Sequence, residues 1–94
     1  MKADLEQHWV HSHEEDSDTE AVYRPASHPF PPARGRDGFE LKAGGSLVEH
    51  GFGPTDRGTR KPGRWTVDAD VLTIGGRSRQ IVSLAPNRLV LRKS

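Results

Sequence analysis

GRWTVDADVLTI (residues 63–74) and QIVSLAPNRLVL (residues 80–91) decide the fold of this 94-residue chain. Their apolar runs are only four to six residues long, and Asp, Gly, Pro or Asn separates each run from the next. Short runs of Val, Ile, Leu, Thr and Trp between such turn residues are typical of strands rather than helices. We therefore expect an antiparallel meander in which each strand pairs with the next and turns one face to a core.

Shorter strand signals precede this meander. Residues 7–13 alternate, so that Trp9, His11 and His13 share one face of an expected first strand. Residues 14–18 are too acidic to bury and predict a loop, and residues 21–24 predict a second strand that ends at Pro25. Residues 25–38 are rich in Pro and Gly, which favours a long irregular loop that either packs as a lid or stays unpacked.

The middle of the chain predicts a hairpin. Residues 39–42 and 46–52 form its strands around Ala43-Gly44-Gly45. In the second strand Leu47 falls on one face, and Val48, His50 and Phe52 fall on the other. Residues 53–58 predict a loop that leads through Lys61 and Pro62 into the strand at residue 63.

Together these signals predict an all-β protein of about eight short strands joined almost entirely by hairpins. Strand twist accumulates in an antiparallel up-and-down meander of that size, and closure into a barrel removes its exposed edges. The interior of an eight-stranded barrel has space for side chains or for one small ligand.

The composition fits a single small domain over residues 1–94. Only 32% of the residues are hydrophobic, and 10 Gly and 7 Pro argue against a helical bundle. A chain of this length buries about 60–70% of its unfolded surface, so that a homodimer would add useful burial. The absence of cysteine excludes disulfides, thiolate metal sites and a Cys nucleophile. No stretch approaches the ~20 apolar residues of a membrane span, and a cytoplasmic protein with no membrane partner is expected.

Charge is unevenly distributed along the chain, although the net charge is only +1. Residues 1–20 contain seven acidic residues and one basic residue, whereas residues 57–94 contain nine basic and two acidic residues. Either the two ends lie side by side and neutralise each other, or the basic end forms a face for nucleic acid. The low net charge argues against a nucleic-acid partner.

Residues 39–91 resemble the small bacterial lipocalin-like domains of the calycin type. The resemblance lies in the Phe39–Ser46 hairpin, the Gly63-x-Trp65 strand start, the strand at 71–74 and the closing hairpin at 81–91. It implies an antiparallel barrel that binds a small apolar or amphipathic molecule. The chain is shorter than a full lipocalin, and it has Gln7-His8-Trp9 where a first Gly-x-Trp would stand.

Small-ligand binding inside the barrel is the first functional hypothesis. Its candidate lining residues are Trp9, Tyr23, Val48, His50, Phe52 and Trp65. Arg34 and Arg36 can clamp an anionic ligand group, because a guanidinium fork matches a carboxylate or phosphate; the alternative is that they pin the loop through salt bridges. Both Trp side chains also suit a core position in which the indole N–H finds one acceptor.

A small metal-dependent or acid–base enzyme built on His11, His13 and His50 is the second hypothesis. Residues two apart on a strand share a face, so His11, His13 and Glu15 can hold one divalent transition metal. The alternative is that they are solvated polar residues at the barrel rim. His50 suits general acid–base catalysis if a carboxylate lies nearby, and otherwise a satisfied core position. A third hypothesis is an interaction module that uses the acidic and basic ends.

Overall fold

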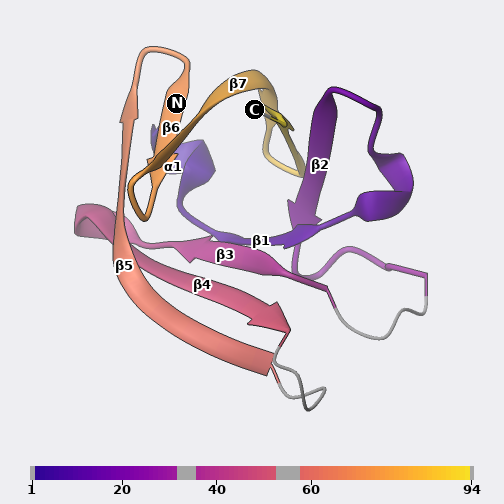
Figure 1. Cartoon of the computed structure of the whole chain (residues 1–94), viewed down its shortest axis with the longest axis horizontal. Helices are drawn as coiled ribbons and strands as arrows, with labels where there is room; N and C mark the ends of the chain where they lie inside the picture. Colours follow the sequence, from indigo (N-terminus) through magenta and orange to yellow (C-terminus); the bar gives the residue numbers. More distant parts are fainter. Residues whose placement is uncertain (1, 32–35, 53–57, 94) are drawn as a thin grey trace.

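The computed structural model describes residues 2–31, 36–52 and 58–93, whose eight strands close into one antiparallel barrel (Figure 1). The all-β fold class and the barrel predicted from the sequence are therefore confirmed. The elements are α1 (Lys2–Leu5), β1 (His8–His11), η1 (His13–Glu15), β2 (Glu20–Pro25), β3 (Gly38–Leu41), η2 (Ala43–Gly45), β4 (Ser46–Phe52), β5 (Gly58–Asp68), β6 (Val71–Ile74), β7 (Arg77–Ala85) and β8 (Arg88–Arg92). No helix among the described residues is long and apolar enough to cross a membrane.

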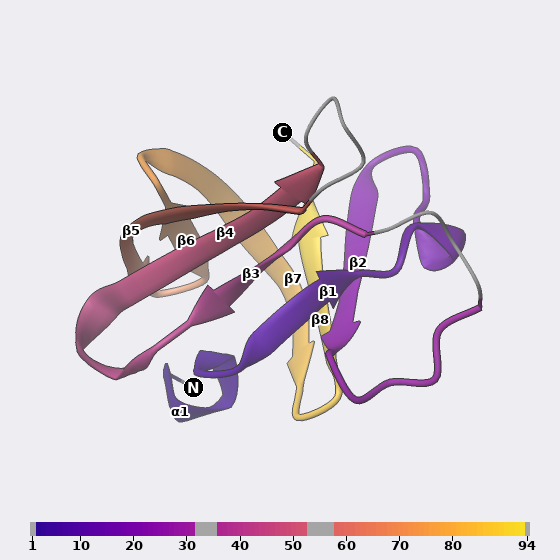
Figure 2. The same ribbon diagram turned by 90° about the horizontal axis from the view of Figure 1, so that it is seen from below.

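The strands from β3 to β8 follow the predicted meander, each paired with the next. The first two strands depart from it, because their places in the order around the barrel are exchanged. β1 pairs with β3, and β2 pairs with β8, so the order around the barrel is β1-β2-β8-β7-β6-β5-β4-β3. Figure 2 shows β1 lying between β2 and β3. β2 and β3 are parallel and flank β1, and such a crossover needs about a dozen residues. The Pro-rich segment at 26–37 is long for this reason.

The first strand is shorter than the sequence predicted. β1 ends at His11, whose amide donates to Asp37 O at 2.8 Å, and the chain then coils into η1. The Ser12 hydroxyl donates to Glu15 Oε2 at 2.8 Å, and the Glu15 amide donates to Ser12 O at 3.0 Å. These local hydrogen bonds compete with the strand ladder, so His13 and Glu15 do not continue the face of His11.

Two later strands are longer than expected. β5 begins at Gly58 and includes Pro62, which the sequence placed before the strand. β6 pairs with β5 only over Trp65–Asp68, so Pro62 is paired with β4 alone, a setting that tolerates a missing N–H. β7 begins at Arg77 because Gly75 and Gly76, with φ of +55° and +86°, complete the hairpin turn in two residues.

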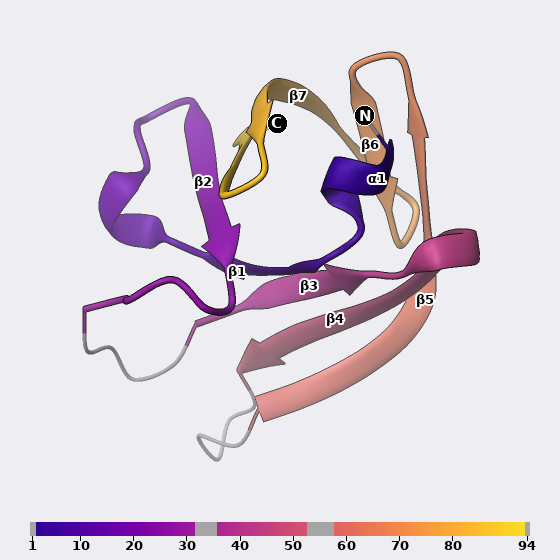
Figure 3. The same ribbon diagram turned by 180° about the vertical axis from the view of Figure 1, so that it is seen from behind.

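The core fills much of the barrel interior. Trp9 and Trp65 are almost fully buried, and their indole N–H groups donate to Leu5 O at 3.0 Å and to Lys42 O at 2.9 Å. The core positions predicted for both Trp side chains are thus confirmed. Leu5 is also fully buried, and the α1 helix that carries it lies against β7 (Figure 3). The other members of the core cluster are Ala21, Tyr23, Phe39, Leu41, Leu47, Leu72, Ile81, Leu89 and Leu91.

The acidic and basic ends of the chain meet where β2 pairs with β8. Glu20 is opposite Arg92 in this ladder, and the Lys93 amide donates to Thr19 O at 2.8 Å. Lys93 Nζ lies 3.6 Å from Asp16 Oδ2. The prediction that the two ends lie side by side is confirmed for these residues.

Candidate functional site

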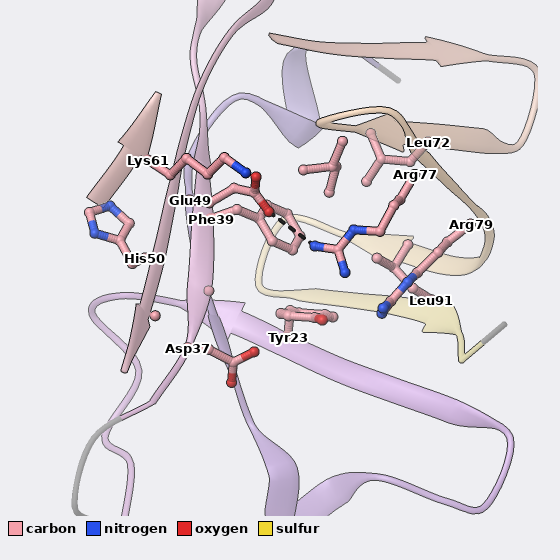
Figure 4. Close-up of a pocket in the computed structure, with 13 residues that line it drawn as sticks. Tyr23, Asp37, Phe39, Glu49, His50, Lys61, Leu72, Arg77, Arg79 and Leu91 are labelled. Carbon is pink, nitrogen blue, oxygen red and sulfur yellow. Dashed lines mark hydrogen bonds and ion pairs between the residues drawn. The ribbon is translucent and has the colours of Figure 1, made fainter. Parts of the chain in front are cut away.

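A pocket of about 360 Å³ opens into the barrel interior beside the core (Figure 4). Residues of β2 to β8 line it, so it lies within the barrel wall rather than on a single loop. Its lining residues are Tyr23, Asp37, Gly38, Phe39, Glu49, His50, Gly51, Lys61, Leu72, Ile74, Arg77, Arg79 and Leu91.

Part of this lining is apolar and continuous with the core. Phe39, Leu72 and Leu91 are buried core residues that reach the pocket, and Ile74 packs against the same cluster. The Tyr23 ring lies 4.9 Å from the Phe39 ring, centroid to centroid. This floor suits the hydrocarbon part of a small molecule.

A charged group from β4, β5 and β7 lies above this floor. Glu49 is two residues beyond the buried Leu47 on β4 and therefore faces the interior. Lys61 is its cross-strand partner on β5, so their side chains share one face. Arg77 Nη2 lies 3.3 Å from Glu49 Oε1, and Figure 4 shows Arg77 reaching toward Glu49.

Arg79 follows Arg77 on the same face of β7. Figure 4 shows its guanidinium directed toward Tyr23. Burial raises the pKa of Tyr23, and the positive charge of Arg79 opposes this rise. No carboxylate among the described residues forms an ion pair with Arg79. The pocket thus contains three cationic side chains and only two acidic ones, Asp37 and Glu49.

Asp37 is itself engaged by a histidine. His11 Nδ1 lies 3.0 Å from Asp37 Oδ1, and His11 Nε2 lies 2.8 Å from Asp16 Oδ2. The hydrogen bond with Asp37, and then that with Asp16, raises the pKa of His11 against the opposing effect of burial. The same contact with His11 lowers the pKa of Asp37. Both ring nitrogens donate only in the imidazolium form, so this arrangement favours protonated His11.

The structure places the predicted ligand-binding residues in different environments. Tyr23 and His50 belong to the pocket lining, although Figure 4 shows the His50 ring on the far side of β4 from Arg77. Trp9 and Trp65 are core residues outside the lining. Val48 alternates with Leu47 and so faces away from the interior.

The two loop arginines were predicted either to clamp a ligand or to pin the loop. Arg36 donates to both carboxylate oxygens of Glu14, one of them at 2.7 Å, and its guanidinium lies 4.7 Å from the Phe30 ring centroid. It therefore pins the segment, as the alternative predicted. Arg34 and the side chain of Phe52 lie outside the described residues.

His11, His13 and Glu15 do not converge as the predicted metal site requires. Both nitrogens of His11 are bonded to Asp16 and Asp37, and the exposed His13 lies in η1, with Nε2 3.8 Å from Glu14 Oε2. Glu15 instead accepts two hydrogen bonds from Arg24, at 2.8 and 2.7 Å, which hold the pKa of Glu15 at about 2. The prediction failed because it extended the strand past His11.

A different histidine cluster lies on the outer face of the barrel. His8, Glu40 and His50 each offer one ligand atom, and these atoms lie within 4.8 Å of one another. The His8 and His50 rings are 4.7 Å apart, centroid to centroid, and His50 Nε2 lies 3.7 Å from Glu40 Oε1. Burial and the neighbouring His50 lower the pKa of His8, and Glu40 opposes this effect.

The sequence interpretation missed Glu49, Lys61, Arg77 and Arg79. Alternation with Leu47 places Glu49 on the interior face of β4, and alternation with Ile81 places Arg77 and Arg79 on the interior face of β7, where Arg79 is half-buried and the Arg77 side chain is 72% exposed. The sequence prediction begins this strand at residue 80, whereas β7 begins at Arg77. The prediction therefore places the two arginines in or beside a turn and not on a strand face.

The chain is therefore a small antiparallel barrel with an amphipathic, cation-rich interior pocket. Comparisons with protein-family models, with curated proteins and with solved structures found no match.

Proposed function

We propose that the barrel binds a small amphipathic anion. The apolar part of the ligand lies on the floor formed by Phe39, Leu72 and Leu91, and its anionic group lies among Lys61, Arg77 and Arg79. The observation that carries the proposal is Arg79, a guanidinium directed into an apolar-floored pocket without a carboxylate partner among the described residues.

Arg79 suits such a ligand because its hydrogen-bond partner in the pocket, Tyr23, is neutral, and a half-buried charge without a counter-charge is costly. A guanidinium fork binds a carboxylate or phosphate through two parallel hydrogen bonds. Arg77 is paired with Glu49, and Lys61 is opposite Glu49 on the neighbouring strand, so one carboxylate lies among the three cations and the site keeps a positive excess. A volume of about 360 Å³ is in the lower part of the range for small-molecule pockets.

The resemblance to lipocalin-like domains of the calycin type supports the same function. At the level of fold, the closed eight-stranded antiparallel barrel agrees with this resemblance. The inserted β1–β2 hairpin departs from an order in which every strand pairs with its successor. The proposal therefore depends on the pocket more than on the family.

Three ten-carbon molecules with different head groups test the proposal. Calorimetric titration of the full chain near pH 7 with decanoate, decanol and decylamine compares an anion, a neutral molecule and a cation on one hydrocarbon chain. We expect decanoate to bind at least about tenfold more tightly than decanol, a difference of about 1.4 kcal/mol. We expect no measurable binding of decylamine.

Arg79→Gln provides the site-specific test. It should weaken decanoate binding by about tenfold or more, because it removes the charged donor and keeps a similar shape. Arg92→Gln is the matched control: Arg92 is exposed on β8 outside the pocket lining, and its loss should leave the affinity unchanged. Equal binding of the three molecules, or equal binding by Arg79→Gln, would contradict the proposal.

A further inference from the structure

The outer face of the barrel holds a histidine-carboxylate cluster that anion binding in the interior does not use. His8 on β1, Glu40 on β3 and His50 on β4 come from three adjacent strands and lie half-buried. We propose that these three side chains bind a divalent transition-metal ion.

The strand register brings the three residues together. His8 is directly opposite Glu40 in the β1–β3 ladder, and Glu40 is opposite Val48, two residues before His50 on β4. His50 is opposite Gly38. Because Gly38 has no side chain, the His50 ring has space to reach across β3 toward His8.

The separations fit a site that needs only a small contraction. The three ligand atoms lie within 4.8 Å of one another, and His50 Nε2 lies 3.7 Å from Glu40 Oε1. Bonds of about 2.0–2.2 Å in a tetrahedral zinc site place neighbouring ligand atoms roughly 3.3–3.6 Å apart. Side-chain movements of about 1 Å therefore close the site without a change in the strands.

An unsatisfied nitrogen supplies a second, independent observation. His50 Nε2 is buried and has no hydrogen-bond partner among the described residues. Buried polar atoms are nearly always satisfied, and an exception calls for an explanation. A metal ion held between His50 and Glu40 would satisfy this atom.

The backbone around the cluster is already fixed. The Ala26 amide donates to His8 O at 3.1 Å, and the Leu41 amide donates to Gln7 O at 3.0 Å. These bonds hold β1 against its neighbours on both sides of His8. A site on rigid strands places its ligands more precisely than a site on loops.

The ligand set indicates the class of metal. Two imidazoles and one carboxylate suit Zn²⁺ and the other divalent first-row metals, and three protein ligands leave coordination positions for water. His11 is a poor competitor for the ion, since both of its ring nitrogens are bonded to carboxylates.

Calorimetric titration of the full-length, tag-free and chelator-treated protein with Zn²⁺ tests the proposal. We expect one equivalent to bind, and we expect Glu40→Gln and His50→Gln each to weaken binding at least about tenfold. His13→Gln is the matched control, because His13 is exposed in η1 and should leave the affinity unchanged. Arg79→Gln should also bind Zn²⁺ normally, which separates this proposal from anion binding in the pocket.

A measurement on the wild-type protein keeps the test decisive if a variant does not fold. Addition of Co²⁺ should give a visible absorption spectrum and should shift or broaden the ring nitrogen signals of His8 and His50 before those of His11, His13 and His28. Substoichiometric Zn²⁺ binding, binding lost with His11 rather than His50, or Co²⁺ effects centred on the other histidines would overturn the proposal.

Discussion

At the scale of single residues, Gly38 marks a close approach between two strands of the barrel wall. A Cβ atom there would lie 2.2 Å from Trp9 O and 3.0 Å from Val10 Cα. Both atoms belong to the backbone of β1, which is paired with β3 at this point. No side-chain rotation can relieve such a contact, so only glycine allows β1 to sit against β3.

Gly38→Ala should therefore destabilise the protein by about 3 kcal/mol or more, at the upper end of the cost of overpacking. Urea unfolding followed by Trp fluorescence measures this change. Gly63→Ala is the control, because its Cβ would meet only the Leu47 side chain, at 3.2 Å, and should cost about 1 kcal/mol or less. Equal losses of unfolding free energy in both variants would show that the close contact of residue 38 with the β1 backbone is not what destabilises Gly38→Ala.

His11 is the second residue whose contacts affect the stability of the protein, in this case as a function of pH. Contacts with Asp37 and Asp16 raise its pKa above the ordinary value of 6.5. A raised pKa in the folded state means that the folded protein binds the proton more tightly than the unfolded chain does. The resulting stabilisation is fully present below pH 6.5 and is lost as the pH rises through the higher folded-state pKa.

The difference in unfolding free energy between the wild type and His11→Gln should accordingly shrink as the pH rises above 6.5. Urea unfolding at several pH values between 5.5 and 9 measures it. The groups that face His11 are Asp16, Asp37, the stacked Tyr23 ring, the His13 ring and Lys93 through Asp16. A difference that is constant over this range would contradict a charged His11.

At the scale of elements, residues 30 and 31 of the crossover segment are held to the barrel by Arg36. Besides Glu14, this nearly buried side chain donates to Pro31 O at 2.8 Å and to His11 O at 3.3 Å. It also lies over the Phe30 ring. One guanidinium thus connects the crossover segment to the end of β1 and to η1.

Arg36→Met should release residues 26–31 and speed their amide hydrogen exchange by about tenfold or more, because a lost set of charged hydrogen bonds costs at least about 1.4 kcal/mol. Hydrogen exchange followed by mass spectrometry measures the effect. Arg24→Met is the control: Arg24 makes a similar pair with Glu15 but has no bond to this segment among the described residues. Comparable exchange rates in both variants would show that Arg36 does not hold residues 26–31 against the barrel.

Elements with strong alternation or clear turns could be predicted from the sequence, and others could not. The strand predicted at residues 46–52 has the bounds of β4, and the turn predicted at residues 75–78 is confirmed in position but ends at Gly76, because Arg77 and Ser78 already belong to β7. The end of β1 at His11 depends on the hydrogen bonds between Ser12 and Glu15, which form η1 where the alternation of residues 7–13 predicted a continuing strand. The inward arginines of β7 were missed because a strand start that is wrong by a few residues hides which side chains share a face.

At the scale of the whole molecule, the barrel followed from the number and shortness of the strands. The position of β1 between β2 and β3 did not, because pairing partners depend on the packing of the complete chain. The candidate metal cluster has the same origin: His8, Glu40 and His50 are distant in sequence and meet only through the registers of β1, β3 and β4. Sequence spacing alone favoured the local pair His11 and His13 instead.

The inserted hairpin also has a consequence for assembly. Without β1 and β2, strands β3 to β8 form an open sheet whose two free edges flank a gap one hairpin wide. The hairpin is synthesised first, but its second neighbour, β8, is synthesised last. The outer edge of β2 therefore stays unpaired until the chain is complete. The corresponding hairpin of a second molecule presents identical edges and fits the same gap, which gives this fold a direct route to a domain-swapped dimer at high concentration.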